Sequence, residues 1–271
     1  MENQDQVKTA NPLKEYMSGL IIFLAILAGV VIYKFILGNP DNFEGGDINN
    51  HPKGGNMLGV FYKGGFLVPL ALGMLIMLIV FTIERFLTLS KASGKGSMDV
   101  FIQQLQLKLE AGDVAGAMAA CDEQAGSVGN VMKAALKKYS EMEKNQTLDK
   151  EQKVLAIQKS LEEATALELP MLEKNLTIVA TLVSVATLVG LIGTVLGMIK
   201  AFSALATAGA PDAVALATGI SEALINTALG ITSSAIATVV YNYFTSRIDV
   251  LTYRIDEGGF SIIQTYAELH K

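Results

Sequence analysis

The segment Gly219–Asn242, GISEALINTALGITSSAIATVVYN, is apolar and long enough to cross a membrane, yet it contains the carboxylic acid Glu222. An ionisable side chain at the centre of a membrane helix costs about 2.5–3.5 kcal/mol even on the milder insertion scales. Glu222 lies about ten residues inside the expected helix, or roughly 15 Å from its start at 1.5 Å per residue. That depth is too great for a short side chain to reach the interface. Glu222 therefore indicates a functional site or a compensating partner.

The whole chain has the composition of a polytopic membrane protein. Of its 271 residues, 51% are hydrophobic and only 17% are charged, whereas about 25% of residues are charged in a typical soluble domain. The deficit is confined to four segments of the length that crosses a bilayer, which is about 20 residues. We therefore expect an all-α fold with four transmembrane helices, at 17–38, 66–86, 174–205 and 213–245.

The remaining segments are expected to connect these spans. They are an N-terminal tail at 1–16, a Gly-rich loop at 39–65, a helical domain at 87–173, a short loop at 206–212 and a C-terminal helix at 246–271. The first span is expected to be a retained anchor, because it is long and no small-x-small cleavage site precedes Gly38. Apolar residues recur at helical spacing in the 87–173 domain, with an interruption at Gly112. Its last helix is expected to continue into the third span with a kink at Pro170.

The distribution of lysine and arginine predicts the orientation. Twelve of these residues lie between Arg85 and Lys174, whereas the loop Ser203–Ala213 has none. Cytoplasmic loops carry the excess of positive residues. The large helical domain and both termini are therefore expected to be cytoplasmic, and the Gly-rich loop at 39–65 to lie outside, with irregular structure.

The last span has two different sides when it is plotted at about 100° per residue. One side is polar or small and comprises Glu222, Asn226, Thr227, Gly230, Ser233, Ser234, Ala237, Thr238 and Tyr241. The other side is formed by larger aliphatic residues such as Leu224 and Ile231. The third span repeats this division more weakly, with Thr187 and Thr194 beside glycines at 190, 193 and 197. Such helices place one side against a polar cavity or a closely packed neighbour.

Simpler explanations account for part of this pattern. Threonine in a membrane helix often bonds to its own i−4 carbonyl, small residues can serve helix packing alone, and Glu222 could be hydrogen-bonded between helices. We expect no buried cation of the same chain at its depth, because Lys200 lies toward the outer end of the third span. The favoured hypothesis is an aqueous lumen or a partner helix enclosed by several copies of the chain, since one helical hairpin cannot enclose a lumen.

Other functional classes have little support. Cys121 is the only cysteine, the two histidines lie far apart, and no phosphate loop or nucleophile elbow is present. We expect no enzyme activity, no cofactor, no metal and no nucleic-acid partner. A solute transporter is disfavoured because no inverted repeat is evident. A purely structural membrane scaffold remains an alternative.

Two adjacent motifs resemble the MotA/TolQ/ExbB proton channel family, and within it the ExbB and TolQ branch. They are LVGLIGTVLGMIKAF at Leu188–Phe202 and ATGISEALINTALGITSSAIATVVYNYFTSRI at Ala217–Ile248, and IERF at Ile83–Phe86 matches as well. The resemblance extends from about residue 66 to 254. The first span and the Gly-rich loop are additions to an ExbB-like three-helix core. The family often has proline near 187–188 and at 237, where this chain has none.

The resemblance implies a homopentameric ring in the bacterial inner membrane, a multi-pass protein whose last two spans line a pore. It further implies a dimeric, single-span, ExbD-like partner with an essential aspartate and a TonB-like protein that transmits the work. By position, Thr194 and Thr227 match the threonines that flank the partner aspartate, and Glu222 matches the pore glutamate. The other expected pore-lining residues are Asn226, Ser233, Ser234 and Thr187. The alternative is a TolQ-, MotA- or gliding-type stator for cell-envelope or motility machinery.

Overall fold

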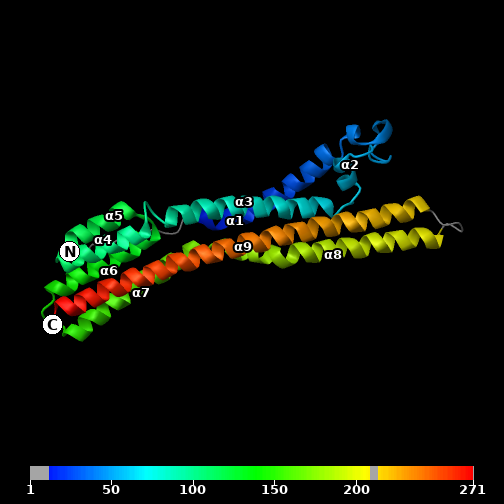
Figure 1. Cartoon of the computed structure of the whole chain (residues 1–271). Helices are drawn as coiled ribbons and strands as arrows, with labels where there is room; N and C mark the ends of the chain where they lie inside the picture. Colours follow the sequence, from blue (N-terminus) through cyan, green and yellow to red (C-terminus); the bar gives the residue numbers. More distant parts are fainter. Residues whose placement is uncertain (1–11, 208–212, 271) are drawn as a thin grey trace. The chain divides into compact units, whose positions relative to one another are not determined.

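The computed structural model describes residues 12–207 and 213–270, with side chains from residue 18 onward. Most of the expected tail at 1–16 and of the expected loop at 206–212 therefore lies outside the described residues. The helices, labelled in Figure 1, are α1 (Pro12–Val31), η1 (Ile32–Leu37), η2 (Pro40–Asn42), η3 (Glu44–Gly46), α2 (Met57–Tyr62), α3 (Val68–Ala92), α4 (Met98–Glu110), α5 (Val114–Gln124), α6 (Gly126–Lys144), α7 (Lys150–Glu173), α8 (Leu176–Thr207) and α9 (Ala213–Leu269).

The all-α prediction is confirmed. Within the described ranges the only β pairing is an isolated bridge between Phe43 and Pro52. Four helical stretches are long and apolar enough to cross a membrane: Ser18–Leu37, Val68–Ala92, one within Lys150–Ala206 and one within Ala213–Leu269. These stretches correspond to the four expected spans. The last span and the expected C-terminal helix form one continuous helix of 57 residues, α9.

The chain divides into two compact units. Unit 1 comprises residues 1–82 and 178–241, and unit 2 comprises 83–177 and 242–271. The long helices α3 and α9 contribute to both units. Unit 1 contains the apolar spans, and unit 2 contains the helical domain that the sequence places between the second and third spans.

The core of unit 1 lies where α3, α8 and α9 meet. Phe81, Val179 and Ala237 are fully buried there. The extra N-terminal span joins this core through a close contact with α3, because a Cβ atom at Gly29 would lie 2.4 Å from the backbone oxygen of Pro69. Only a residue without a side chain permits two helices to approach this closely.

Helices α8 and α9 lie side by side as an antiparallel pair (Figure 1) and contact each other through glycines. A Cβ atom at Gly230 would lie 2.6 Å from the oxygen of Ala186 and 2.8 Å from the Cα atom of Gly190. Gly193 similarly abuts Asn226, and Gly197 abuts Ala223. The predicted close-approach role of the glycines in the third span is therefore confirmed, and their neighbour is α9 of the same chain.

The Gly-rich loop has short helices and a specific set of hydrogen bonds. Asn42 donates to the carbonyls of Ile36 and Leu37 at 2.8 and 2.9 Å. The ammonium of Lys63 donates to the oxygens of Ile48 and Asn49 at 2.8 and 3.1 Å. Because these bonds cross the loop, the segment at 39–65, hereafter the outer segment, forms a small ordered subdomain on unit 1.

In unit 2, helices α4 to α7 pack against one another and against the end of α9. Met132, Ile157 and Tyr266 are fully buried. The predicted interruption at Gly112 is confirmed, since this residue has φ +71° between α4 and α5. A capping box between Asp149 and Gln152 begins α7.

The prediction of a helix that is continuous into the third span with a kink at Pro170 is wrong. Helix α7 passes through Pro170 and ends at Glu173, and α8 begins at Leu176. The interruption lies at Asn175, which has φ +63°. Asparagine tolerates this left-handed conformation better than most residues.

The glycine contact between α8 and α9 can be tested by adding one methyl group. We expect Gly230→Ala to separate the helices and to lower the free energy of unfolding by about 1–3 kcal/mol, the usual effect of overpacking. Thermal unfolding of the purified protein in detergent measures the change. Gly19→Ala is the control, because no atom lies within 4 Å of a Cβ placed at Gly19. Equal unfolding midpoints for the two variants would contradict the prediction.

Candidate functional site

The residues singled out from the sequence meet along the contact between α8 and α9. Thr227 and Glu222 lie on α9, and Thr194 and Lys200 lie on α8. Because the helices run antiparallel, Thr194 is opposite Thr227, and Lys200 is opposite Glu222. The second pair lies one to two turns closer than the first to the end of α8 and the start of α9. All of these residues belong to unit 1.

The two threonines form a hydroxyl pair. The Oγ1 atoms of Thr194 and Thr227 are hydrogen-bonded to each other, and each lies 3.3 Å from the carbonyl oxygen of Gly190. Thr227 also bonds to its own i−4 carbonyl, that of Ala223, at 3.1 Å. The hydroxyl of Thr227 therefore contacts both a carbonyl of its own helix and the hydroxyl of Thr194 on the facing helix. Hydroxyl groups both donate and accept hydrogen bonds, so this pair can stabilise a carboxyl group in either protonation state.

Glu222 has a cationic partner in its own chain. Its Oε2 atom lies 2.7 Å from the Nζ atom of Lys200, and the exposed fractions of the two side chains are 11% and 63% respectively. The sequence analysis expected no buried cation of the same chain at this depth; a cation of the same chain does pair with Glu222, but it is the mostly exposed side chain of Lys200. Lys200 lies seven residues before the end of α8 and Glu222 nine residues after the start of α9, so the two residues lie at similar depths in an antiparallel pair.

Backbone of the outer segment covers Glu222. A Cβ atom at Gly65, which has φ +80°, would lie 2.0 Å from Oε1 of Glu222. Asn226, only 3% exposed, donates to the backbone oxygen of Gly64 at 2.7 Å and to the backbone carbonyl oxygen of Glu222, four residues earlier in α9, at 3.0 Å. The sequence analysis missed Gly64 and Gly65 as site residues. A glycine pair immediately before a span was the available signal.

The other predicted residues lie farther along the same contact. Ser233 is buried, and the Ser234 hydroxyl donates to the backbone oxygen of Val183 on α8. Thr187 is half-buried on α8. Part of the polar stripe of α9 therefore packs against α8 within one chain, whereas Leu224 and Ile231 on its aliphatic side are exposed.

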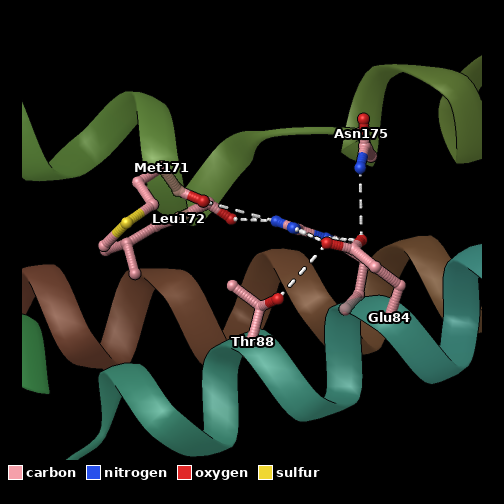
Figure 2. Close-up of polar contacts among 6 residues, drawn as sticks. Glu84, Thr88, Met171, Leu172 and Asn175 are labelled. Carbon is pink, nitrogen blue, oxygen red and sulfur yellow. Dashed lines mark hydrogen bonds and ion pairs between the residues drawn. The ribbon is translucent and has the colours of Figure 1, made fainter. Parts of the chain in front are cut away.

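A second polar cluster, in unit 2, surrounds the IERF motif (Figure 2). Arg85 is only 1% exposed, and its guanidinium contacts both carboxylate oxygens of Glu84 at 2.6 and 2.5 Å. It also donates to the oxygen of Leu172 at 3.1 Å, close to the C-terminal end of α7. Glu84 in turn accepts hydrogen bonds from Thr88 and from Asn175 at 3.3 Å each. This network satisfies the buried charge and holds the chain at the break between α7 and α8.

Few other groups have reactive chemistry. In the part of the chain that the structure describes, no three His, Cys, Asp or Glu side chains are grouped as a metal would require. Burial raises the pKa of the Cys121 thiol to about 12, so this thiol is protonated and unreactive at neutral pH. The groups that remain are a carboxylate, an ammonium and hydroxyls along one helix pair. Such groups can bind and exchange protons.

The Arg85 cluster makes a prediction about stability. We expect Arg85→Leu to destabilise unit 2 by about 3–5 kcal/mol, because it leaves the Glu84 carboxylate without its cation. The measurement is thermal unfolding in detergent. Lys159→Ala is the control, since Lys159 and its partner Glu163 are both exposed, and such pairs contribute about 0–1 kcal/mol. A similar loss in both variants would show that the cluster has no special role.

Comparison with known proteins gives a consistent result. Residues 124–257 match the model of the MotA/TolQ/ExbB proton channel family. A Tol-Pal system protein TolQ of Pseudomonas aeruginosa is 32% identical over 127 residues, which is 47% of this chain and 55% of that protein. A biopolymer transport protein ExbB of Helicobacter pylori is 39% identical over 94 residues, or 35% of this chain and 64% of that protein.

An ExbB homologue from Methanothermobacter thermautotrophicus matches over a longer range. It is 28% identical over 220 residues, which is 79% of this chain and 74% of that protein. The chain spans less than two thirds of the length of the TolQ and H. pylori ExbB relatives. The family-model match includes Thr194, Glu222 and Thr227.

Proposed function

We propose that this chain, which matches the MotA/TolQ/ExbB proton channel family over residues 124–257 and is similar to TolQ and ExbB proteins, is the channel and stator subunit of an ExbB–ExbD-type motor in the bacterial inner membrane. In this proposal the motor converts proton motive force into mechanical work for TonB-dependent transport at the outer membrane. The observation that supports it most directly is the meeting of Thr194, Thr227 and Glu222 along one helix pair. These are the groups that proton exchange requires.

The proposed working unit is a homopentamer around a dimeric single-span partner. One α8–α9 pair cannot enclose a path, and its outer surface carries exposed apolar side chains, among them Val195, Ile199 and Phe202. Large exposed apolar surfaces of a span are covered by lipid or by other helices. Several copies that share these surfaces would surround the partner helix with the polar edges of α8 and α9, and both termini would be cytoplasmic.

The proposed mechanism depends on the cost of moving charge through a medium of low dielectric. A proton from the outer side neutralises the aspartate of the partner, which can then pass apolar surface, whereas the ionised form prefers the hydroxyl pair of Thr194 and Thr227. Each charge that crosses the membrane supplies about 2.3 kcal/mol per 100 mV. Glu222 serves as a relay or electrostatic gate, and Asn226, Ser233, Ser234 and Thr187 line the path.

A second candidate is a Tol-type stator for cell-envelope machinery. TolQ relatives match this chain about as well as ExbB relatives do. The two functions share the ion chemistry and differ in the partner protein. A MotA- or gliding-type stator would differ in the same way.

Removal of the exchangeable groups tests the function. We expect Glu222→Gln and Thr227→Val to abolish proton-driven work and proton flux while the oligomer still assembles, because the shape is kept and the exchangeable proton or its acceptor is lost. Thr194→Val should have the same effect. Proton flux in vesicles that contain the complete complex is the measurement. Thr232→Val is the matched control, an exposed threonine on the same helix; wild-type flux in all three test variants would refute the mechanism.

Co-purification tests the assembly. We expect native mass measurement of the complex, co-expressed with a single-span protein that carries a membrane aspartate, to give five copies of this chain and two of the partner. A monomeric chain, or a complex that forms without any such partner, would contradict the proposed stator.

A further inference from the structure

We propose that Lys200, Glu222 and the Gly64–Gly65 turn form a lock at the outer end of the proton path, and that release of Lys200 opens it. This inference rests on the proposed function, because it assigns to Glu222 a closed state within that path. These four residues, hereafter the outer lock, all belong to unit 1. Lys200 is then a gating residue that competes with the proton for one carboxylate.

The two partners of the ion pair differ in their freedom to move. The Glu222 side chain is 11% exposed, and Gly65 abuts its Oε1 atom, so the carboxylate is confined. The Lys200 side chain is 63% exposed and ends in a long flexible stem. When the lock opens, the ammonium is therefore the group that departs.

Departure of Lys200 changes what Glu222 must bind. A buried carboxylate without its cation is costly, and the cost is removed when the group takes up a proton. Lys200 in place therefore compensates the charge of Glu222, and its release leaves the confined carboxylate without that compensation. The ammonium acts as a substitute for the proton and closes the path while the motor is idle.

The Gly64–Gly65 turn connects the outer lock to the rest of the outer segment. Asn226 on α9 holds the turn, since its side-chain amide donates to the backbone oxygen of Gly64; its other hydrogen bond is to the backbone carbonyl of Glu222 in its own helix. The preceding residue, Lys63, donates from its ammonium to two backbone oxygens of the outer segment. Burial lowers the pKa of Lys63, Asp47 opposes this shift, and the ammonium of Lys200 adds to it. Lys63 and Lys200 therefore repel each other while Lys200 is paired with Glu222, and this repulsion favours the departure of Lys200.

A cavity lies close to the outer lock, lined by sequence neighbours of its residues. It has a volume of about 550 Å³ and lies between the outer segment and the start of α9. Its lining includes His51, Lys63, Thr218 and Ser221, the residue that precedes Glu222. A cavity of this size with several polar groups can hold water. Water in this cavity would reach Ser221, one residue before Glu222, while no residue of the outer lock lines the cavity.

Proton leak through the chain without its partner tests the lock. In proteoliposomes that contain the purified full chain, we expect Lys200→Met to raise passive proton leak about tenfold, the factor that corresponds to about 1.4 kcal/mol of lost pairing. Lys200→Arg should remain sealed. The double variant Lys200→Glu with Glu222→Lys should also seal, because the pair is kept with its charges exchanged.

Lys53→Met is the control for the loss of a positive charge on the outer side, because Lys53 is exposed in the outer segment and should not alter the leak. An unchanged leak in Lys200→Met, or an equal rise in Lys53→Met, would overturn the lock.

Chemical labelling tests the ion pair without any measurement of conduction. We expect Lys200 to react slowly with a membrane-impermeant N-hydroxysuccinimide ester, and Glu222→Gln to accelerate this reaction relative to Lys53, as read by mass spectrometry. Unchanged labelling of Lys200 in Glu222→Gln overturns the lock and leaves the proposed function standing. Accelerated labelling together with wild-type proton flux in the Glu222→Gln complex overturns the role of Glu222 in the proton path, and the gating role with it; the proposed function itself is refuted only if the flux of Thr194→Val and Thr227→Val is also that of the wild type.

Discussion

The close approach of α8 and α9 is the constraint on which the site depends. Gly190 and Gly230 bring the two backbones so near that a single methyl group would not fit between them. At this separation short side chains on facing turns reach each other, which is why the hydroxyls of Thr194 and Thr227 meet. Larger residues at the glycine positions would separate the helices, and the hydroxyl pair would be lost with the contact.

Much of this arrangement could be predicted from the sequence, because it depends on local periodicity. The length of the apolar segments predicts four spans, and they are present among the described residues. The wheel of the last span places Glu222 and Asn226 on one side and Leu224 on the other, and the first two are buried while Leu224 is exposed. A helical period of 3.6 residues determines such faces independently of tertiary structure.

The features that the sequence analysis missed depend on register and on distant contacts. Periodicity gives the face on which Lys200 lies, but the residue opposite it depends on the axial offset of α8 and α9. The Gly64–Gly65 turn reaches Glu222 from more than 150 residues away in the chain. The break before α8 lies at Asn175, which has φ +63° and donates to Glu84 across 91 residues. Contacts between residues so far apart in the chain cannot be predicted from a local sequence pattern.

The Arg85–Glu84 and Lys200–Glu222 ion pairs differ in a way that bears on their roles. Arg85 is 1% exposed and bonds to Glu84 and to backbone oxygens of α7, so its removal from the pair would leave several buried groups unsatisfied. That pair is permanent and structural. Lys200 is mostly exposed and bonds to Glu222 alone among the described residues. The ammonium of Lys200 has no second partner to lose in the described part of the chain, so the cost of separation falls on the confined Glu222 carboxylate. An ion pair built in this manner is suited to opening, and its opening is coupled to proton uptake.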